Sequence, residues 1–400
     1  GCKVNAYETE AMQELLEKHG YEIVPFQEGA DVYIINTCTV TNMADRKSRQ
    51  MLHKARKMNP DSIVVACGCY VQARKDDIPD GIDIVIGNNK KQNIVEILEN
   101  YEKEKNPDAQ AGTPAKQEKA AETYQEILDI NHEKAYEDLH LSTAAEHTRA
   151  YIKVQDGCNQ FCSYCIIPYA RGRVRSRKVE DILEEIVNLT KHGCQEFVIT
   201  GIHVTSYGKD LGDITLIDLL EEIAQIDGVK RIRLGSLEPG FITKDTLDRL
   251  SKIESFCPHF HLSLQSGCDS VLKRMNRKYT TQDIREKCKA IREHFEYPAL
   301  TTDIIVGFPG ETDEEFEQTY NFIKKVNYSE LHVFPYSPRK NTPAAKMKDQ
   351  VKDQIKHERT NRLLELSKEL NRNFALKQIG KSLKVLFEKR EGDYLIGHAS

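Results

Sequence analysis

The stretch Cys158-Asn159-Gln160-Phe161-Cys162-Ser163-Tyr164-Cys165 places three thiols at C-x3-C-x2-C spacing, directly after the strand-like run 151–155. Three thiolates on one short loop can hold three irons of a cubane [4Fe-4S] cluster and leave the fourth iron open to a further ligand. A structural zinc site is the alternative, but it needs four ligands, usually in paired Cys or His spacings. Since no fourth Cys or His follows at a short interval, the spacing favours the open iron–sulfur cluster.

A regular alternation of strand-like and helical runs begins at this motif. Each of six strand-like runs is followed by a helical run, and the strands are expected at 151–155, 196–200, 230–234, 259–264, 300–306 and 330–334. Repeated βα units predict a parallel sheet curled into a partial (βα)6 barrel, shorter than the eight-unit form. We therefore predict an α/β barrel domain at residues 149–375.

Glycines and polar residues recur within or just after these strands, and barrel enzymes place their chemistry on the loops that follow the strands. Glycine lets a ligand approach the backbone closely, and hydroxyl, carboxyl or amide groups can bond a ribose or an amino acid moiety. Such residues also punctuate ordinary turns, but their repetition at the same end of successive strands predicts one shared pocket. The candidates are Gly201, Ser236, Glu238, Gln265 and Asp303.

Residues 1–98 also alternate strands and helices, with strands expected at 21–26, 31–36, 62–66 and 82–86. The pattern predicts a small Rossmann-like or flavodoxin-like α/β domain with a largely parallel sheet. Cys2, Cys38 and either Cys67 or Cys69 fall near the ends of elements, where open α/β sheets bind ligands. These thiols could share a second metal centre, or they could be small buried residues. Strand alternation puts Cys67 and Cys69 on the same face, so it does not choose between them.

The number of cysteines limits the classes of protein to which the chain can belong. Eleven cysteines, an odd number in 400 residues, fit no disulfide framework and indicate reduced thiols in a cytoplasmic protein. No apolar run approaches the roughly 20 residues that cross a bilayer, so no membrane segment is expected. The first residue is Gly1 rather than Met, which indicates that the chain is not the complete gene product.

The net charge of −5 comes from one segment, because residues 101–150 carry it and the rest of the chain balances. We predict an acidic, partly disordered linker at 101–148, between an N-terminal domain at 1–100 and the barrel. Residues 350–375 are typical of a long charged helix, and 382–398 of a hairpin that turns at Glu391-Gly392. Two strands are not stable alone, so the hairpin either packs on the barrel or begins a further domain.

Two basic stretches stand outside the linker. Residues 44–57 predict a basic helix, and Arg171, Arg173, Arg175 and Arg177 alternate as they would on one face of a strand. Contact with RNA phosphates is one interpretation of both stretches. A solvated helix face and structural salt bridges are the alternatives.

Several separated motifs give the chain a resemblance to known families. Cys158, Cys162 and Cys165, with Tyr164 before the last of them, resemble the signature of the radical S-adenosylmethionine (SAM) superfamily. Taken with the other motifs, the chain resembles the methylthiotransferase family. Those motifs are Gly-Cys-Lys-Val-Asn (1–5), Asn-Thr-Cys-Thr-Val-Thr (36–41), Gly-Cys-Tyr-Val-Gln (68–72), Arg-Gly-Arg-Val-Arg-Ser-Arg (171–177), Leu-Gln-Ser-Gly (264–267) and Asp-Ile-Ile-Val-Gly-Phe-Pro-Gly-Glu-Thr (303–312).

Within that family the chain is most similar to tRNA N6-threonylcarbamoyladenosine (t6A) methylthiotransferases. The first two motifs and Ser263, where related branches more often have Pro, carry this narrower resemblance. The family pattern takes its third N-terminal ligand from Gly-Cys-x-x-Gln, which favours Cys69 over Cys67. Residues 376–400 resemble the start of a small β-barrel RNA-binding (TRAM-like) domain, here incomplete.

The resemblance implies an enzyme with two [4Fe-4S] clusters and SAM, which replaces the C2 hydrogen of adenosine 37 in the tRNA anticodon loop with a methylthio group. It implies that Cys158, Cys162 and Cys165 hold the cluster that cleaves SAM, and that Cys2, Cys38 and Cys69 hold an auxiliary cluster that supplies the sulfur. Tyr164 and the five pocket candidates would face SAM, and the four arginines would face RNA.

The partners implied are tRNA and a reductant protein such as flavodoxin or ferredoxin, without DNA or a membrane. Two alternatives share the chemistry: methylthiolation of N6-isopentenyladenosine (i6A) at position 37, or of a ribosomal-protein aspartate. An alternative of another class is an iron–sulfur RNA-binding protein without turnover.

Overall fold

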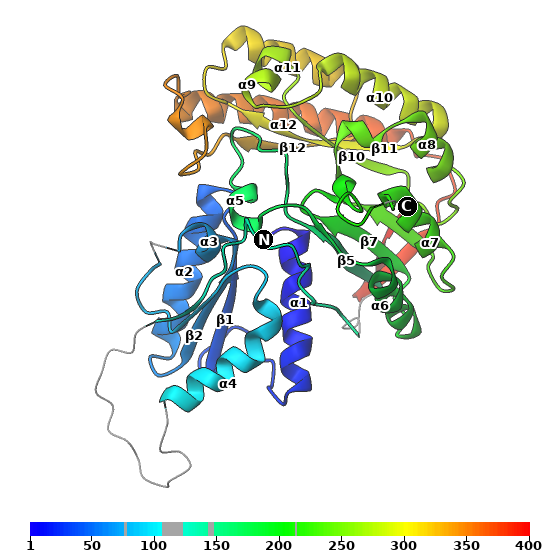
Figure 1. Ribbon diagram of the computed structural model, residues 1–400. Helices are drawn as coiled ribbons and strands as arrows, with labels where there is room; N and C mark the ends of the chain where they lie inside the picture. The colour runs from blue at the N-terminus through cyan, green and yellow to red at the C-terminus, as the bar shows by residue number, and fades with distance from the viewer. Residues whose placement is uncertain (76–77, 106–122, 143–147, 213) are drawn as a thin grey trace. The chain divides into compact units, whose positions relative to one another are not determined.

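The computed structural model describes residues 1–75, 78–105, 123–142, 148–212 and 214–400 (Figure 1). The chain divides into two compact units, which are described separately. The first comprises Gly1–Ser142, Gly157–Asn159 and Ile166–Arg175, and the second comprises Thr143–Asp156, Gln160–Cys165 and Ser176–Ser400.

The first unit is built on a parallel sheet with the strand order β1-β2-β3-β4. Its strands are β1 (Val32–Thr37), β2 (Ile63–Gly68), β3 (Ile84–Ile86) and β4 (Tyr124–Glu126). Its helices are α1 (Lys3–Lys18), α2 (Asn42–Met58), α3 (Cys69–Ala73), α4 (Ile94–Lys105) and α5 (Ile167–Arg171), with a short 3-10 turn at Lys91–Asn93. Tyr33, Leu52, Val64 and Tyr70 pack in its core. The predicted parallel α/β domain is therefore present, and residues 44–57 are helical as expected.

Two sequence predictions for this unit are wrong. Residues 21–26 form no strand, and Ile23, Val24 and Phe26 are exposed, because none of the strands in the described residues pairs with this run. The segment 123–142, predicted as part of the linker, belongs to the unit: β4 extends the sheet next to β3, and Leu139 is buried. The remainder of the predicted linker, 106–122 and 143–147, lies outside the described residues.

The second unit contains two sheets, with the orders β6-β5-β7-β8 and β9-β10-β11-β12. β5, β7 and β8 run parallel, and so do β9 to β12. The strands are β5 (Arg149–Asp156), β6 (Arg175–Ser176), β7 (Glu196–Gly201), β8 (Arg231–Leu234), β9 (Ser236–Leu237), β10 (His259–Gln265), β11 (Ala299–Val306) and β12 (Glu330–Pro335). Backbone hydrogen bonds from Ile232 to Ser255 (2.8 Å) and from Cys257 to Ile232 (2.9 Å) join β8 to the segment just before β10. All six predicted strands are confirmed, with bounds within two residues of those expected.

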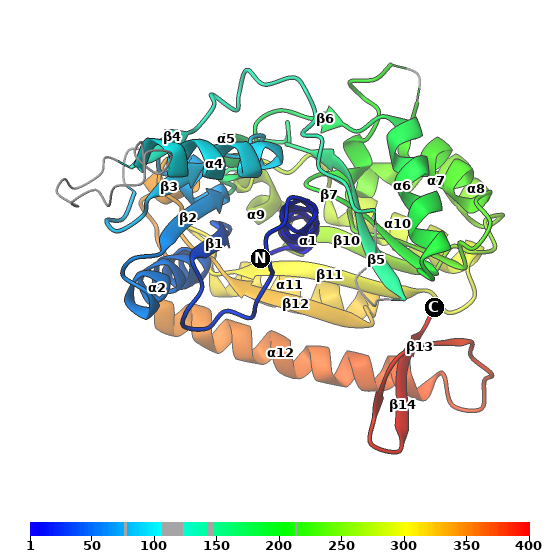
Figure 2. The same cartoon turned by 90° about the horizontal axis from the view of Figure 1, so that it is seen from below.

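Helices follow the strands of this unit as the repeated βα pattern predicts. They are α6 (Val179–Lys191), α7 (Leu216–Ala224), α8 (Lys244–Leu250), α9 (Asp269–Arg274), α10 (Thr281–His294), α11 (Asp313–Val326) and α12 (Asp353–Leu376), and short 3-10 turns lie at Val204–Ser206, Pro239–Phe241 and Ala344–Lys346. Thr215, Thr280 and Thr312 begin three of the helices with capping boxes, which satisfy backbone amides that the helix leaves unpaired. α12 runs alongside β12 (Figure 2), where Leu331 donates a backbone hydrogen bond to the Ser367 hydroxyl (3.0 Å).

The chain ends in the predicted hairpin, β13 (Val385–Glu391) and β14 (Tyr394–Ala399). It is held to the second unit by Arg231, which donates to the carbonyls of His398 (2.8 Å) and Lys384 (2.7 Å), and by Arg233, which donates to that of Ala399 (2.6 Å). The hairpin therefore packs on the barrel strand β8, one of the two outcomes expected. In the described ranges, no helix is both long and apolar enough to span a bilayer.

Candidate functional site

The second part of the cysteine motif forms a tight loop in the second unit. The Cys165 amide donates to the Cys162 carbonyl (3.0 Å), which closes a turn between the two thiols. Ser163 fixes the loop, because its amide donates to the Met275 carbonyl (3.0 Å) and its hydroxyl to the Arg274 carbonyl (2.8 Å). The positions of both thiols are thus set by backbone contacts to the end of α9.

Arg277 is a site residue that the sequence prediction missed. Its Nη1 donates to Cys162 Sγ at 3.0 Å, and its Nη2 donates to Glu238 Oε1 at 2.6 Å. The side chain is only 5% exposed. A guanidinium stays charged and always donates, so this contact places a positive charge beside the Cys162 sulfur. No spacing rule in the sequence pairs Arg277 with a cysteine 115 positions earlier.

Three of the predicted SAM residues lie on barrel strands, and two of these end their strand. Gly201 ends β7, where a Cβ atom would come within 2.9 Å of Gln155 Oε1, and Gln265 ends β10 in a left-handed conformation (φ 68°). Ser236 is exposed at the start of β9. These three residues lie on strands of the barrel, as predicted, and their contact with SAM stays a prediction.

Three other predicted SAM residues have specific protein partners. Tyr164 packs edge-on against Phe308, with ring centroids 6.5 Å apart, and Glu238 binds Arg277. Asp303 lies in the middle of β11 rather than in the loop after it, between His261 and His332. Although burial raises its pKa, hydrogen bonds from these two histidines hold the pKa of Asp303 well below its usual range.

Cys158, the first thiol of the motif, is buried in the first unit. Its amide donates to the Gly172 carbonyl (3.0 Å). Gly157 has φ +71°, and a Cβ atom there would lie 1.7 Å from the Arg173 carbonyl oxygen. Only glycine allows this close approach of the two segments.

The N-terminal cysteines also lie at the ends of elements, as predicted. Cys2 is the N-cap of α1, Cys38 directly follows β1, and Cys69 is the first residue of α3. The Cys38 amide donates to the Ser48 hydroxyl (3.2 Å), which ties this thiol's backbone to α2.

Cys67 and Cys69 differ sharply, so the expectation that they share a strand face is wrong. Gly68, with φ +95°, ends β2 between them, and Cys69 belongs to the helix instead. The Cys67 thiol donates to the Ile35 carbonyl (3.7 Å), and burial raises its pKa to about 12. Cys69 instead accepts hydrogen bonds at its sulfur.

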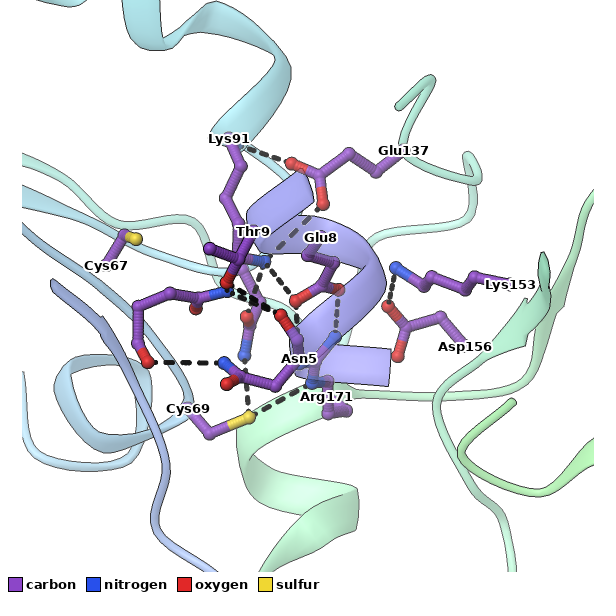
Figure 3. A network of polar contacts seen from close by, with 12 residues as sticks. Asn5, Glu8, Thr9, Cys67, Cys69, Lys91, Glu137, Lys153, Asp156 and Arg171 are labelled. Atoms are coloured by element: carbon purple, nitrogen blue, oxygen red, sulfur yellow. Dashed lines mark hydrogen bonds and ion pairs between the residues drawn. The ribbon is translucent and has the colours of Figure 1, made fainter. Parts of the chain in front are cut away.

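Those bonds belong to a buried polar network (Figure 3). Arg171 Nε donates to Cys69 Sγ at 3.0 Å and Asn88 Nδ2 lies 3.7 Å from the same sulfur. The two Nη atoms of Arg171 bind the Glu8 carboxylate, with one distance of 2.9 Å. Lys91 Nζ lies 3.3 Å from Glu8, 3.6 Å from the Glu137 carboxylate and 2.8 Å from Asn88 Oδ1.

The arginine stretch does not form one strand face, so that expectation is wrong. Arg171 ends α5 and is fully buried, whereas Arg175 lies on β6 and donates to the carbonyls of Arg171 (3.0 Å) and Arg173 (3.1 Å). Arg177 forms a buried ion pair with Glu185. Arg173 alone among the four is exposed, and RNA contact stays a prediction that its position permits.

That the two cysteine sets hold open iron–sulfur clusters stays a prediction. In each set a sulfur faces a charged donor: Cys162 faces Arg277, and Cys69 faces Arg171. Hydrogen bonds to the sulfurs are one of the levers by which proteins tune such clusters. Each thiolate of a cubane binds a different iron, so the three sulfurs need not converge on one point.

Comparison with known proteins gives matches over almost the whole chain. Residues 152–323 match the radical SAM superfamily, and residues 1–87 match an uncharacterized protein family, UPF0004. A threonylcarbamoyladenosine tRNA methylthiotransferase of Bacillus subtilis is 42% identical, covering 97% of this chain and 83% of its own. One of Aquifex aeolicus is 39% identical, with 96% and 90% covered.

A second class of relative is also similar. A tRNA-2-methylthio-N6-dimethylallyladenosine synthase of Clostridium botulinum is 35% identical, covering 99% of this chain and 87% of its own. Among solved structures, the radical SAM methyltransferase TsrM of Kitasatospora setae superposes with a TM-score of 0.61 at 16% identity, covering 85% and 74% of the two chains. This structural likeness concerns the fold alone.

Proposed function

The chain belongs to the radical SAM tRNA methylthiotransferases, and on that premise we propose that it methylthiolates C2 of t6A at position 37 of tRNA. The observation that carries this substrate is the order of identities among relatives. Two threonylcarbamoyladenosine enzymes are 42% and 39% identical to the chain, whereas the dimethylallyladenosine synthase is 35% identical.

The two cysteine sets are assigned separate clusters in this proposal. Cys158, Cys162 and Cys165 would hold the SAM-binding cluster, and Cys2, Cys38 and Cys69 the auxiliary one. With SAM bound, the first cluster would supply the one-electron chemistry needed to activate an unreactive C–H bond, and the second would supply the sulfur.

The chain's own residues contribute binding, orientation and the exclusion of water. Arg277 donates a hydrogen bond to the Cys162 sulfur and is itself oriented by Glu238. Arg171 does the same for Cys69 and is oriented by Glu8. Each sulfur is therefore held by a buried guanidinium that a carboxylate fixes in place, so little reorganisation is needed when the cluster changes charge.

Contacts to SAM and tRNA are proposed for further residues. Gly201, Ser236 and Gln265 would face SAM, since they lie on the barrel strands β7, β9 and β10. Arg173 and the basic helix α2 would contact tRNA phosphates. The target nucleotide must leave its stack to expose C2 to the radical, as in other enzymes that act on a base.

The test is turnover by the anaerobically reconstituted protein with SAM, a reductant and unmodified, t6A-containing or i6A-containing tRNA. We expect about eight irons per chain, as two four-iron cubanes require, with 5′-deoxyadenosine and the methylthio nucleoside formed from t6A-tRNA. Methylthiolation of i6A-tRNA alone would favour the activity of the dimethylallyladenosine relatives. Iron without any 5′-deoxyadenosine would contradict the enzyme assignment and favour a binding protein.

Supporting partners follow from the same proposal. A one-electron donor is required, and flavodoxin or ferredoxin is the class that we expect to deliver it. The cytoplasmic location stays a prediction from the cysteine content. Turnover should continue when the chemical reductant is replaced by purified flavodoxin or ferredoxin with its reductase. Failure of both carriers to support turnover would contradict this expectation.

A further inference from the structure

Three neighbouring strands of the second unit present a cluster of metal-ligand side chains without cysteine. His261 lies on β10, Asp303 on β11 and His332 on β12. In the sheet register, Asp303 is opposite His332, and His261 is opposite Thr301, two residues before Asp303. Because side chains alternate along a strand, the three residues share one face. The intervening Leu262, Thr302 and Leu331 are buried on the other face.

The distances within this cluster suit one bound ion. His261 Nε2 lies 3.2 Å from Asp303 Oδ2, and His332 Nδ1 lies 3.4 Å from Asp303 Oδ1. One ligand atom from each residue lies within 4.8 Å of the other two. Tetrahedral ligands at 2.0–2.1 Å from zinc are separated from each other by about 3.3–3.4 Å. The two carboxylate–imidazole distances therefore match those of adjacent ligands.

A second layer of contacts orients one of these rings. Thr301 Oγ1 lies 2.9 Å from His261 Nδ1 and 2.9 Å from His259 Nε2. Metal-binding histidines almost always use their other ring nitrogen in such a hydrogen bond, which fixes the tautomer. When Thr301 accepts from His261 Nδ1, the Nε2 atom on the other side of the ring faces the Asp303 carboxylate and is the ring atom available to a metal ion.

We propose that His261, Asp303 and His332 bind one divalent transition-metal ion of the zinc or ferrous type. Two imidazoles and one carboxylate are the ligand set of metal sites that keep open positions for water or substrate. The side chains of Asp303 and His332 are 26% and 49% exposed, so the ion could exchange and bind an external ligand. The site would be a third metal centre, independent of both cysteine sets.

Zinc binding to the reconstituted holoprotein tests this site. Wild type, His332→Ala and Thr301→Val are dialysed anaerobically against buffered Zn²⁺, and zinc and iron per chain are measured together. His332 is half exposed, so its replacement should not impair folding. His294→Ala is the matched control, since His294 forms an ion pair of 3.0 Å with Asp248 and no third ligand joins them in the described structure.

We expect wild type and His294→Ala to bind one more zinc per chain than His332→Ala, at unchanged iron. Thr301→Val should retain the site with about 10–100-fold weaker affinity, as loss of an orienting hydrogen bond predicts. In X-ray absorption spectra of the wild-type protein, the additional zinc ion, which His332→Ala lacks, should show only nitrogen and oxygen ligands. The proposal would be overturned if wild type and His332→Ala bound the same amount of zinc, or if Thr301→Val bound zinc as tightly as wild type. It would also be overturned if the additional zinc of the wild type had sulfur ligands. The three residues would then be only a hydrogen-bonded His–Asp–His array.

Discussion

Arg171→Met should destabilise the first unit by about 3 kcal/mol. The Arg171 and Glu8 side chains are fully buried, and so is Lys91, while Glu137 is 1% exposed. These four groups carry two positive and two negative charges, so the network is neutral. Losing one partner of a buried pair costs about 3–5 kcal/mol, because the other charge stays buried. The lower end applies here, since Lys91 remains 3.3 Å from Glu8.

The double-mutant cycle with Glu8→Gln isolates this effect. Glu8→Gln alone leaves one surplus positive charge, Arg171→Met alone leaves one surplus negative charge, and the double variant is neutral again. The double variant should therefore cost about 2 kcal/mol less than the sum of the single changes, within the range seen for residues in contact. Shape is nearly conserved in both substitutions, so packing contributes little to the difference.

Anaerobic urea denaturation of iron-free protein, followed by circular dichroism, measures these free energies without a contribution from cluster binding. Arg249→Met is the control, because Arg249 pairs with Asp218 (2.6 Å) and Glu221 (2.5 Å) at the surface and should cost no more than about 1 kcal/mol. The reasoning is refuted if Arg171→Met costs as little as Arg249→Met, or if the two changes in the cycle are additive.

Three further predictions concern the clusters and pH. Arg277→Met removes a hydrogen bond to a cluster sulfur and should lower the reduction potential of that cluster. A redox titration followed by electron paramagnetic resonance measures this potential, and an unchanged potential would show that the contact is irrelevant. Cys69→Ala should reduce iron from about eight to about four per chain, whereas Cys67→Ala should keep it, and the opposite result would reassign the ligand. The Arg274 hydrogen bond lowers the pKa of Glu315 from 4.5 to about 2, so its stabilisation is present above pH 4.5 and is lost as pH falls towards 2. Glu315→Gln should accordingly cost about 1 kcal/mol at neutral pH, since the pair is partly solvated, and a cost that persists at pH 2 would contradict this account.

The elements of the barrel could be predicted because local signals and burial agree. β7 (Glu196–Gly201) has an apolar centre at 197–199 and is buried at every position except the last, which is typical of a strand that is covered on both faces. The amphipathic face of α6 buries Ile182, Ile186 and Leu189. Threonine caps mark where helices begin, as at Thr280. The hydrophobic period, the length of each apolar run and the helix-capping residues thus predict the same elements.

Predictions failed where the outcome depends on partners distant in the sequence. Residues 21–26 have the composition of a strand but no neighbour to pair with. The segment 123–142 has a polar composition, yet its Glu137 is buried beside Lys91. Arg171 is buried because Glu8 lies 163 positions away in the sequence and next to it in the fold. Charge alone suggested a surface contact, and only the fold supplies the compensating carboxylate.

The candidate cluster cysteines could be proposed from their spacing, but the arginines that contact two of them could not. C-x3-C-x2-C is specific because three ligands share one loop. Arg277 and Arg171 act on Cys162 and Cys69 from other elements, and arginine is too common on protein surfaces to be identified by type. The cluster of His261, Asp303 and His332 on β10–β12 was missed for the same reason, since it appears only when the strand register is known.

The central claim is best tested by the nucleosides of tRNA. A bacterial host whose tRNA contains t6A without a methylthio group would express this chain, and its tRNA would be digested and analysed by mass spectrometry. We predict that the 2-methylthio derivative of t6A appears, and that it is absent with a Cys162→Ala variant expressed at the same level. A tRNA profile that is unchanged by an iron-loaded wild-type protein would contradict the account.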